Sequence, residues 1–181
     1  MRTTLALLVV SLVSVGCGAR DEAAQPVSEP IARSGPIAVY EAFAPAPILI
    51  ESAALYFTLR NDGAEPDTLL SVSVDVADSA TLHTQVSSGA EGEGGGGGGG
   101  SMRMAPLEYL VVPAGGVALL VPGGHHVMLT ALHVKFEEGD TIHAEVTLAR
   151  AGTISFAVPV LSYADVADRV ERRSPEGQHQ D

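Results

Sequence analysis

The stretch LLSVSVDV, residues 69–76, decides the fold class, because apolar and polar side chains alternate along it. Leu70, Val72 and the valines that follow are predicted to point to one side, and the residues between them to the other. A period of two is typical of a β-strand with one buried face. The stretch therefore predicts a half-buried strand.

Other short strands flank this one at similar spacing. Residues 54–59, ALYFTL, are rich in β-forming side chains and end at the turn-forming sequence RNDG, residues 60–63. We predict no long amphipathic helix within the domain. The fold class is therefore all-β, a β-sandwich or barrel of about seven to eight strands. The further predicted strands are 81–86, 102–112, 117–121, 127–132, 141–149 and 153–160.

The N-terminus carries an export signal. Arg2 is followed by an apolar run over residues 5–15, which is too short to span a bilayer as a helix and fits a secretory signal peptide over residues 1–16. Cys17, the only cysteine, comes next and resembles the lipidated cysteine of bacterial lipoproteins. The alternative is an ordinary signal with an incidental cysteine. Both alternatives predict secretion across the inner membrane, and the first predicts a periplasmic, membrane-anchored lipoprotein.

The rest of the chain divides by composition. Residues 17–35 are predicted to be a flexible linker and residues 36–163 the folded domain, with a glycine-rich loop insertion at 89–100. Residues 164–181 are polar and predict a short helix or a frayed tail. The formal net charge of −12 argues against a nucleic-acid partner, because phosphate binding needs clustered Lys and Arg.

Histidine and methionine side chains recur at strand positions that share a face. His126 and Met128 are two residues apart in a predicted strand, and so are Met102 and Met104. His83 lies in the strand before the glycine-rich loop. If the strands on either side of that loop pair, His83 can face Met102 or Met104.

These side chains suit a soft metal ion. Thioether sulfur is polarisable and selects copper(I), and imidazole also binds copper. The set is a poor cage for magnesium or calcium and unusual for structural zinc. A blue-copper centre is excluded because the predicted domain has no cysteine. Taken singly, a strand methionine is more often core and a lone histidine more often a surface residue.

Over residues 37–160 the chain resembles the periplasmic PCu(A)C copper chaperones, which have a cupredoxin-like Greek-key β-sandwich. The family motif is H-x10-M-x21-H-x-M, and the last part matches in register from Met104 to Met128. The first interval is ten residues too long, which matches the glycine-rich insertion. The stretches that carry the resemblance are ALYFTLRN (54–61), MRM (102–104), VPAGG (112–116) and PGGHHVML (122–129).

The resemblance implies that one copper(I) ion per chain is bound by His83, Met104, His126 and Met128. It implies that His125 is not a ligand. The implied function is an extracytoplasmic copper chaperone, whose acceptor is a protein such as a cytochrome c oxidase copper centre or a thioredoxin-like assembly factor. We expect no enzymatic activity, because the sequence holds no nucleophile–base set and no cofactor fingerprint. A non-metal adhesion or scaffold lipoprotein domain is the alternative, and copper storage or resistance is a variant of the first hypothesis.

Overall fold

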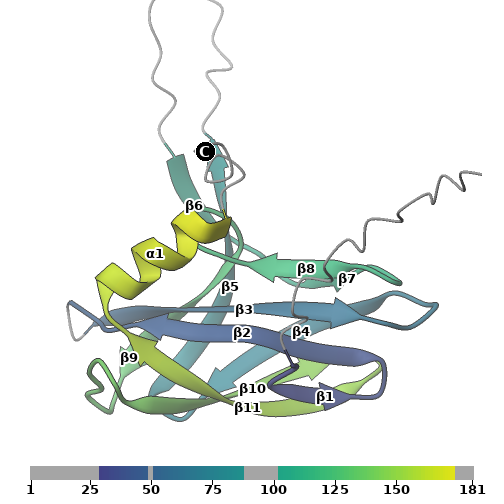
Figure 1. Ribbon diagram of the computed structural model, residues 1–181, viewed down its shortest axis with the longest axis horizontal. Helices are drawn as coiled ribbons and strands as arrows, with labels where there is room; N and C mark the ends of the chain where they lie inside the picture. Colours follow the sequence, from purple (N-terminus) through teal and green to yellow (C-terminus); the bar gives the residue numbers. More distant parts are fainter. Residues whose placement is uncertain (1–28, 49–50, 88–101, 174–181) are drawn as a thin grey trace, which may run out of the picture.

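The computed structural model describes residues 29–48, 51–87 and 102–173. These residues form eleven strands and one helix (Figure 1). The predicted signal peptide, Cys17 and the glycine-rich insertion lie outside the described residues. The elements are β1 (Ala32–Ser34), β2 (Ile37–Pro45), β3 (Ser52–Asn61), β4 (Asp67–Val74), β5 (Ala77–Ser87), β6 (Met102–Pro106), β7 (Leu110–Val112), β8 (Val117–Leu120), β9 (His126–Leu132), β10 (Thr141–Leu148), β11 (Gly152–Leu161) and α1 (Tyr163–Arg173).

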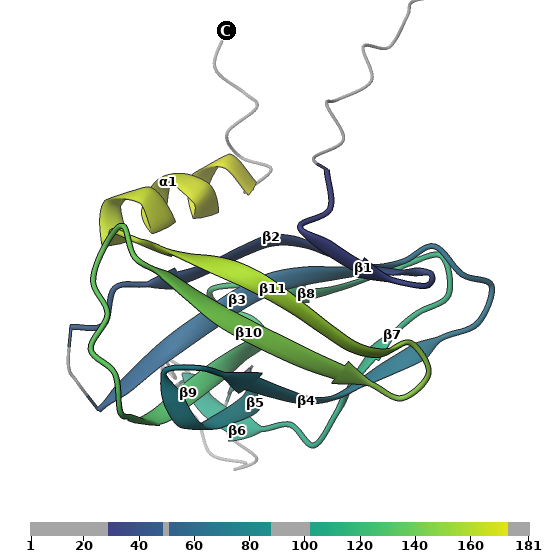
Figure 2. The same ribbon diagram turned by 90° about the horizontal axis from the view of Figure 1, so that it is seen from below.

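Seven of the strands close into a ring, which gives the domain a barrel-like sheet (Figures 1 and 2). Around the ring the order is β2, β11, β10, β4, β5, β9 and β3, and the pairing of β3 with β2 closes it. Four further strands are not part of the ring, and each pairs with one ring strand: β1 with β2, β6 with β5, β7 with β4 and β8 with β3. The all-β prediction is confirmed, with eleven strands in the described residues rather than seven or eight. The Greek-key sandwich stays a prediction.

The inside of the ring is filled by alternate side chains of its strands. In β11 every second residue from Ile154 to Val160 is buried, and β10 shows the same alternation. Phe57 of β3 and Phe156 of β11 meet edge to face across the core, with ring centroids 5.5 Å apart. The period of two that the sequence shows is therefore the period of core packing.

Leu70 departs from the predicted alternation. Leu69 is fully buried, whereas Leu70 is 50% exposed. The pairing of β4 with β10 shifts here, because Leu148 pairs with Leu69 and the next pair skips Leu70. A one-residue bulge reverses the alternation at that point. Val72, beyond the bulge, is buried as predicted.

Several strand boundaries differ from the prediction, and two of the differences change the topology. The single strand predicted at 102–112 is two strands, of which β6 pairs with β5 and β7 with β4. Pro106 lacks the N–H that a continuing strand would donate, and β6 ends there. The sheet also starts earlier than residue 36, because β1 lies within the predicted linker and pairs with β2.

β2 was not predicted as a strand. Its apolar run, IAVYEAFAP, is interrupted only by Glu41, where the pairing with β3 shifts and φ is +54°. A strand that is buried on both faces shows little alternation, so the period-two signal is weak there.

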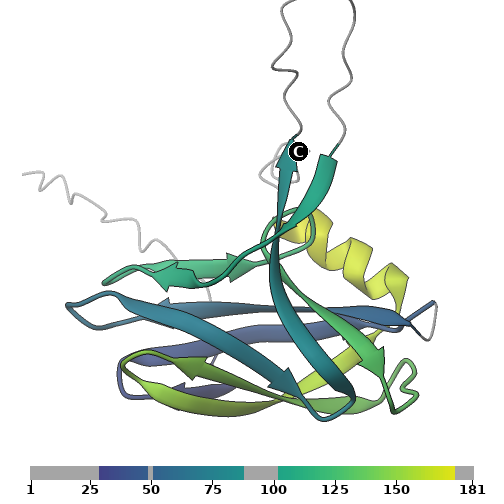
Figure 3. The same cartoon turned by 180° about the vertical axis from the view of Figure 1, so that it is seen from behind.

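β5 connects the ring to a two-stranded extension that it forms with β6 (Figure 3). Its first part pairs with β9 as far as His83, and its last part pairs with β6 from His83 to Ser87. His83 therefore lies where β5 leaves the ring. After β11 the chain forms α1, which has no buried residue. Within the described part of the chain, no helix combines the length and the hydropathy needed to cross a membrane.

Candidate metal centre

His83 is paired on both sides, with His126 of β9 and with Pro106 of β6. Residues directly opposite each other in an antiparallel pair point to the same face of the sheet. The next pair along, Leu82 and Val127, is buried in the core. The two histidine side chains therefore lie together on the outer face of the barrel.

The two imidazoles stack and share one orientation. Their ring centroids are 5.9 Å apart, with 20° between the ring planes. His83 donates from Nδ1 to the Thr81 carbonyl at 3.2 Å, and His126 donates from Nδ1 to the Gly124 carbonyl at 3.1 Å. A carbonyl oxygen only accepts, so the neutral form of each imidazole carries its proton on Nδ1 and has the lone pair on Nε2. Metal-binding histidines are commonly held in this way.

The two methionines of the motif lie on either side of His83 along β5. Met128 of β9 is opposite Thr81, and Met104 of β6 is opposite Gln85. Thr81 and Gln85 share the face of His83, so both methionines belong to that face as well. Each is one diagonal step from His83, which a long side chain can reach. The structure thus places all four predicted ligands on one face of β6, β5 and β9.

The two ends of this face differ in their exposure to water. His126 is 5% exposed, and the Tyr56 ring lies 6.4 Å from the His126 ring, with Phe43 5.1 Å beyond Tyr56. Burial, and secondarily the nearby Tyr163, raises the pKa of the Tyr56 phenol. Met104, by contrast, is 54% exposed. The face therefore runs from a dry end at β9 to an open end at β6.

The neighbours of the motif occupy different positions. Met102 is opposite Ser87, two pairs further from His83 than Met104. His125 precedes β9, and its Nδ1 is buried without a hydrogen-bond partner among the described residues.

The remaining described histidines lie apart from this face. His133 Nδ1 is 3.1 Å from Asp78 Oδ1, and His143 Nδ1 is 3.2 Å from Asp75 Oδ2. Within residues 29–48, 51–87 and 102–173, no three His, Cys, Asp or Glu side chains form a metal-binding group. A metal at the motif would therefore depend on thioether ligands.

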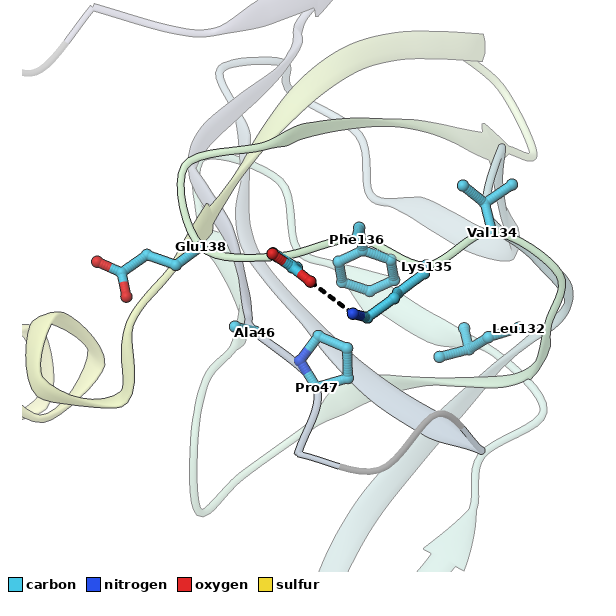
Figure 4. A pocket seen from close by; sticks show the side chains of 8 residues that line it. Ala46, Pro47, Leu132, Val134, Lys135, Phe136 and Glu138 are labelled. Carbon is cyan, nitrogen blue, oxygen red and sulfur yellow. Dashed lines mark ion pairs between the residues drawn. The ribbon is translucent and has the colours of Figure 1, made fainter.

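A small cavity of about 250 Å³ opens elsewhere, at the ends of β2 and β9 (Figure 4). Its lining includes Pro47, Leu132 and Phe136, and also Lys135 and Glu137, which form an ion pair of 2.6 Å. None of the four predicted ligands lines it. The lining offers no constellation of catalytic groups.

Comparison with known proteins places the chain in a family. The family model described as "LpqE-like: Putative lipoprotein LpqE-like" matches residues 37–160, more than half of the chain. The chain belongs to this family. Among curated proteins, this LpqE-like chain is similar to "Putative lipoprotein Lxx21020" of Leifsonia xyli subsp. xyli (strain CTCB07), with 29% identity over 112 residues, 61% of each chain. It thus spans about three fifths of the length of that relative.

Solved structures share the fold of this LpqE-like chain. The copper-bound PCuAC domain from PmoF2 matches with a TM-score of 0.58 and 21% identity, over 72% of this chain and 96% of that one. The apo PCuAC domain from PmoF1 gives 0.57 and 22%, over 72% and 97%. The solution structure of CuI-DR1885 from Deinococcus radiodurans gives 0.51 and 27%, over 72% and 82%. The resemblance to PCuAC domains that the sequence indicated is confirmed.

Sequence reasoning assigned no role to Tyr56, which packs against His126. Tyr56 lies in a stretch that carries the family resemblance, but nothing in the local pattern says which strand lies beside it. β3 pairs with β9 in a register that sets Leu55 opposite Val127, which places Tyr56 next to His126. Only the long-range pairing reveals the contact.

Proposed function

We propose that the chain binds one copper(I) ion on the outer face of β5, β6 and β9 and passes it to an acceptor protein outside the cytoplasm. The two histidines contribute Nε2 and the two methionines contribute thioether sulfur. The observation that carries this proposal is the shared orientation of the stacked imidazoles, both of which keep Nε2 free. The ligands are His83, Met104, His126 and Met128.

The donor set favours copper(I) over other ions. Two thioethers and two neutral imidazoles form a soft, uncharged set, which suits a singly charged soft ion. No carboxylate appears in this set, so calcium and magnesium find no oxygen ligands of the kind they need. The copper-bound PmoF2 domain and CuI-DR1885, which share the fold, support copper as the ion.

The open end of the site suits transfer. A carrier must hold its ion firmly and still let an acceptor reach it. Met104, at the exposed β6 end, is the ligand that an incoming acceptor meets first. The ion is thus cargo, entering and leaving at the β6 end while the β9 end stays in place.

The lipoprotein description of the family supports a membrane-anchored carrier. We propose lipidation at Cys17, with the following residues up to β1 as a tether in the periplasm. The proposed acceptor is a copper centre of a respiratory oxidase, with a thioredoxin-like assembly factor as a partner. A tethered carrier would be kept close to such membrane-bound acceptors.

The test of the site is an anaerobic copper(I) competition titration of the purified full chain, combined with X-ray absorption at the copper edge. We expect one ion per chain with mixed nitrogen and sulfur scattering. The double variant His126→Ala/Met128→Leu should lose binding and keep the circular dichroism spectrum of a β-protein. The matched control, His143→Ala/Met102→Leu, also loses one histidine and one methionine and should bind normally. Unchanged affinity in the first variant contradicts the site.

Delivery and storage differ in what happens to the bound ion. We mix the copper-loaded chain with a soluble oxidase copper-centre domain whose cysteines are reduced, and follow copper by its absorbance in the acceptor. Transfer supports delivery, and retention by the chain supports storage. No turnover is expected, so oxygen consumption by the copper-loaded chain with a reductant should match that of free buffer.

A further inference from the structure

A second hollow lies between α1 and the outer face of the sheet. Its volume is about 900 Å³, within the range of small-molecule sites. We call it the α1 hollow. Its walls come from β2, β3, the end of β8 and the last two turns of α1. The family match ends at residue 160, so α1 lies outside the matched residues.

The charge of the α1 hollow is opposite to that of the chain. Arg169, Arg172 and Arg173 line it, and Glu41 is the one carboxylate among its lining residues. The chain as a whole has 22 acidic residues against ten Lys and Arg. Three of those ten basic residues therefore face one hollow, which gives it a local positive potential.

The three arginines are not equally engaged. Arg173 pairs with Glu41, which the irregular pairing of β2 brings toward α1. The guanidinium of Arg169 lies 5.3 Å from the centre of the Phe43 ring. Arg172 has no carboxylate partner among the residues that the structure describes. Among the described residues, Arg172 thus has neither a carboxylate nor an aromatic ring as a partner, and its guanidinium can bind a carboxylate or phosphate in the bidentate manner.

Thr58 gives an independent indication of a ligand. The residue is 8% exposed and lines the hollow, yet its hydroxyl has no hydrogen-bond partner among the described residues. A buried hydroxyl without a partner lowers stability, and such groups in native proteins are usually satisfied by water or a ligand. Around it the walls are apolar, with Phe43, Leu119 and Pro122.

We infer that the α1 hollow binds an amphiphilic anion, a ligand that joins a carboxylate or phosphate headgroup to an apolar body. Arg172 and the Thr58 hydroxyl hold the headgroup, and the walls of Phe43, Leu119 and Pro122 cover the apolar body. This site shares no residue with the proposed copper ligands, so it stands whether or not the chain carries copper.

The test is an NMR titration of the isotope-labelled full chain with octanoate and octyl phosphate. At least one of the two should bind saturably and shift the amide signals of Thr58 and Leu119, and the tighter one identifies the headgroup. Octylammonium has the same apolar body with a positive charge and should not bind there. Failure of both anions, or equal binding of octylammonium, overturns the inference.

Two variants test the residues. Arg172→Gln should weaken anion binding about tenfold, the effect of losing one charge-assisted contact. Arg150→Gln, which removes an arginine that pairs with Glu65 away from the hollow, should leave it unchanged. Thr58→Val should weaken binding while raising the melting temperature, because it removes an unpaired buried hydroxyl. Equal affinity in Arg172→Gln and the unaltered chain overturns the inference.

Discussion

The two ends of the candidate copper site are built differently. His126 and Met128 belong to β9, a strand of the closed ring that pairs with β3 on one side and β5 on the other. Met104 belongs to β6, which lies outside the ring and pairs with β5. His83 joins the two, because it is paired with both strands. The β9 end is therefore fixed by strand pairing on both sides, whereas the β6 end is paired on one side.

This difference separates two tasks that a carrier must perform. A ligand whose orientation is fixed before binding loses little conformational freedom when the ion arrives, and so it favours affinity. A ligand on an exposed strand can turn away at low cost and let the ion go. We expect the β9 end to set how tightly copper is held, and the β6 end to set how fast it leaves.

The largest effect is expected for His126→Ala. Loss of this buried ligand should lower copper(I) affinity by more than about 100-fold, since even residues that only support a ligand contribute about 10–100-fold. A competition titration against a copper(I) chelator measures the change, with His143→Ala as the histidine control. A loss no greater than that of Met104→Leu would break the comparison between the two ends.

A smaller effect is expected for Met128→Leu, which keeps the shape of the side chain and removes its sulfur. Affinity should fall by about tenfold or more, because a soft ligand is lost from the fixed end. X-ray absorption should show one fewer sulfur neighbour. Full sulfur scattering in this variant would mean that Met102 or another thioether has taken its place.

Met104→Leu sharpens the comparison through kinetics. We expect only a few-fold loss of affinity, roughly threefold, but a faster release of copper(I) to the chelator in stopped-flow measurements. Met102→Leu is the matched control and should leave the release rate unchanged. A large loss of affinity without a faster release would assign Met104 to the fixed end.

The smallest effect concerns Tyr56, which marks the dry end. Burial raises its pKa, so the neutral phenol is favoured in the folded state. Its contribution to stability is complete below the ordinary tyrosine pKa of about 10 and is lost as pH rises through the higher folded value. In an ultraviolet titration, Tyr56→Phe should remove the last phenolate to form. A last step that survives in this variant would contradict the assignment of the raised pKa to Tyr56.

The local patterns of the sequence predicted strands but not their partners. The alternation over residues 69–76 predicted β4, but β4 ends at Val74, and Leu70 departs from the alternation because the pairing with β10 contains a bulge there. The turn residues correctly ended β3. The sequence analysis did not predict β2, because its buried apolar run shows no clear period of two. These failures share a cause, since bulges and buried strands depend on neighbours that are distant in sequence.

The same limit applies to the site. That His126 and Met128 share a face follows from strand geometry alone. That His83 meets His126 depends on the register between β5 and β9, more than forty residues apart in the chain. The family motif implied the four ligands, but it did not give their arrangement in space. The carbonyl partners of Nδ1 and the contact with Tyr56 became visible only in three dimensions.

The exposure of Met104 also determines where the protein is first damaged by oxidation. Thioethers that reach solvent are oxidised first, and the resulting sulfoxide is polar and no longer a soft ligand. Peroxide should therefore modify Met104 before the half-buried Met128, which peptide mapping by mass spectrometry can follow. Enzymatic reduction of the sulfoxide would restore it. An oxidised chain would keep the histidine pair and lose the thioether ligand at the β6 end. The fraction of Met104 sulfoxide would therefore report how much oxidant the protein has met.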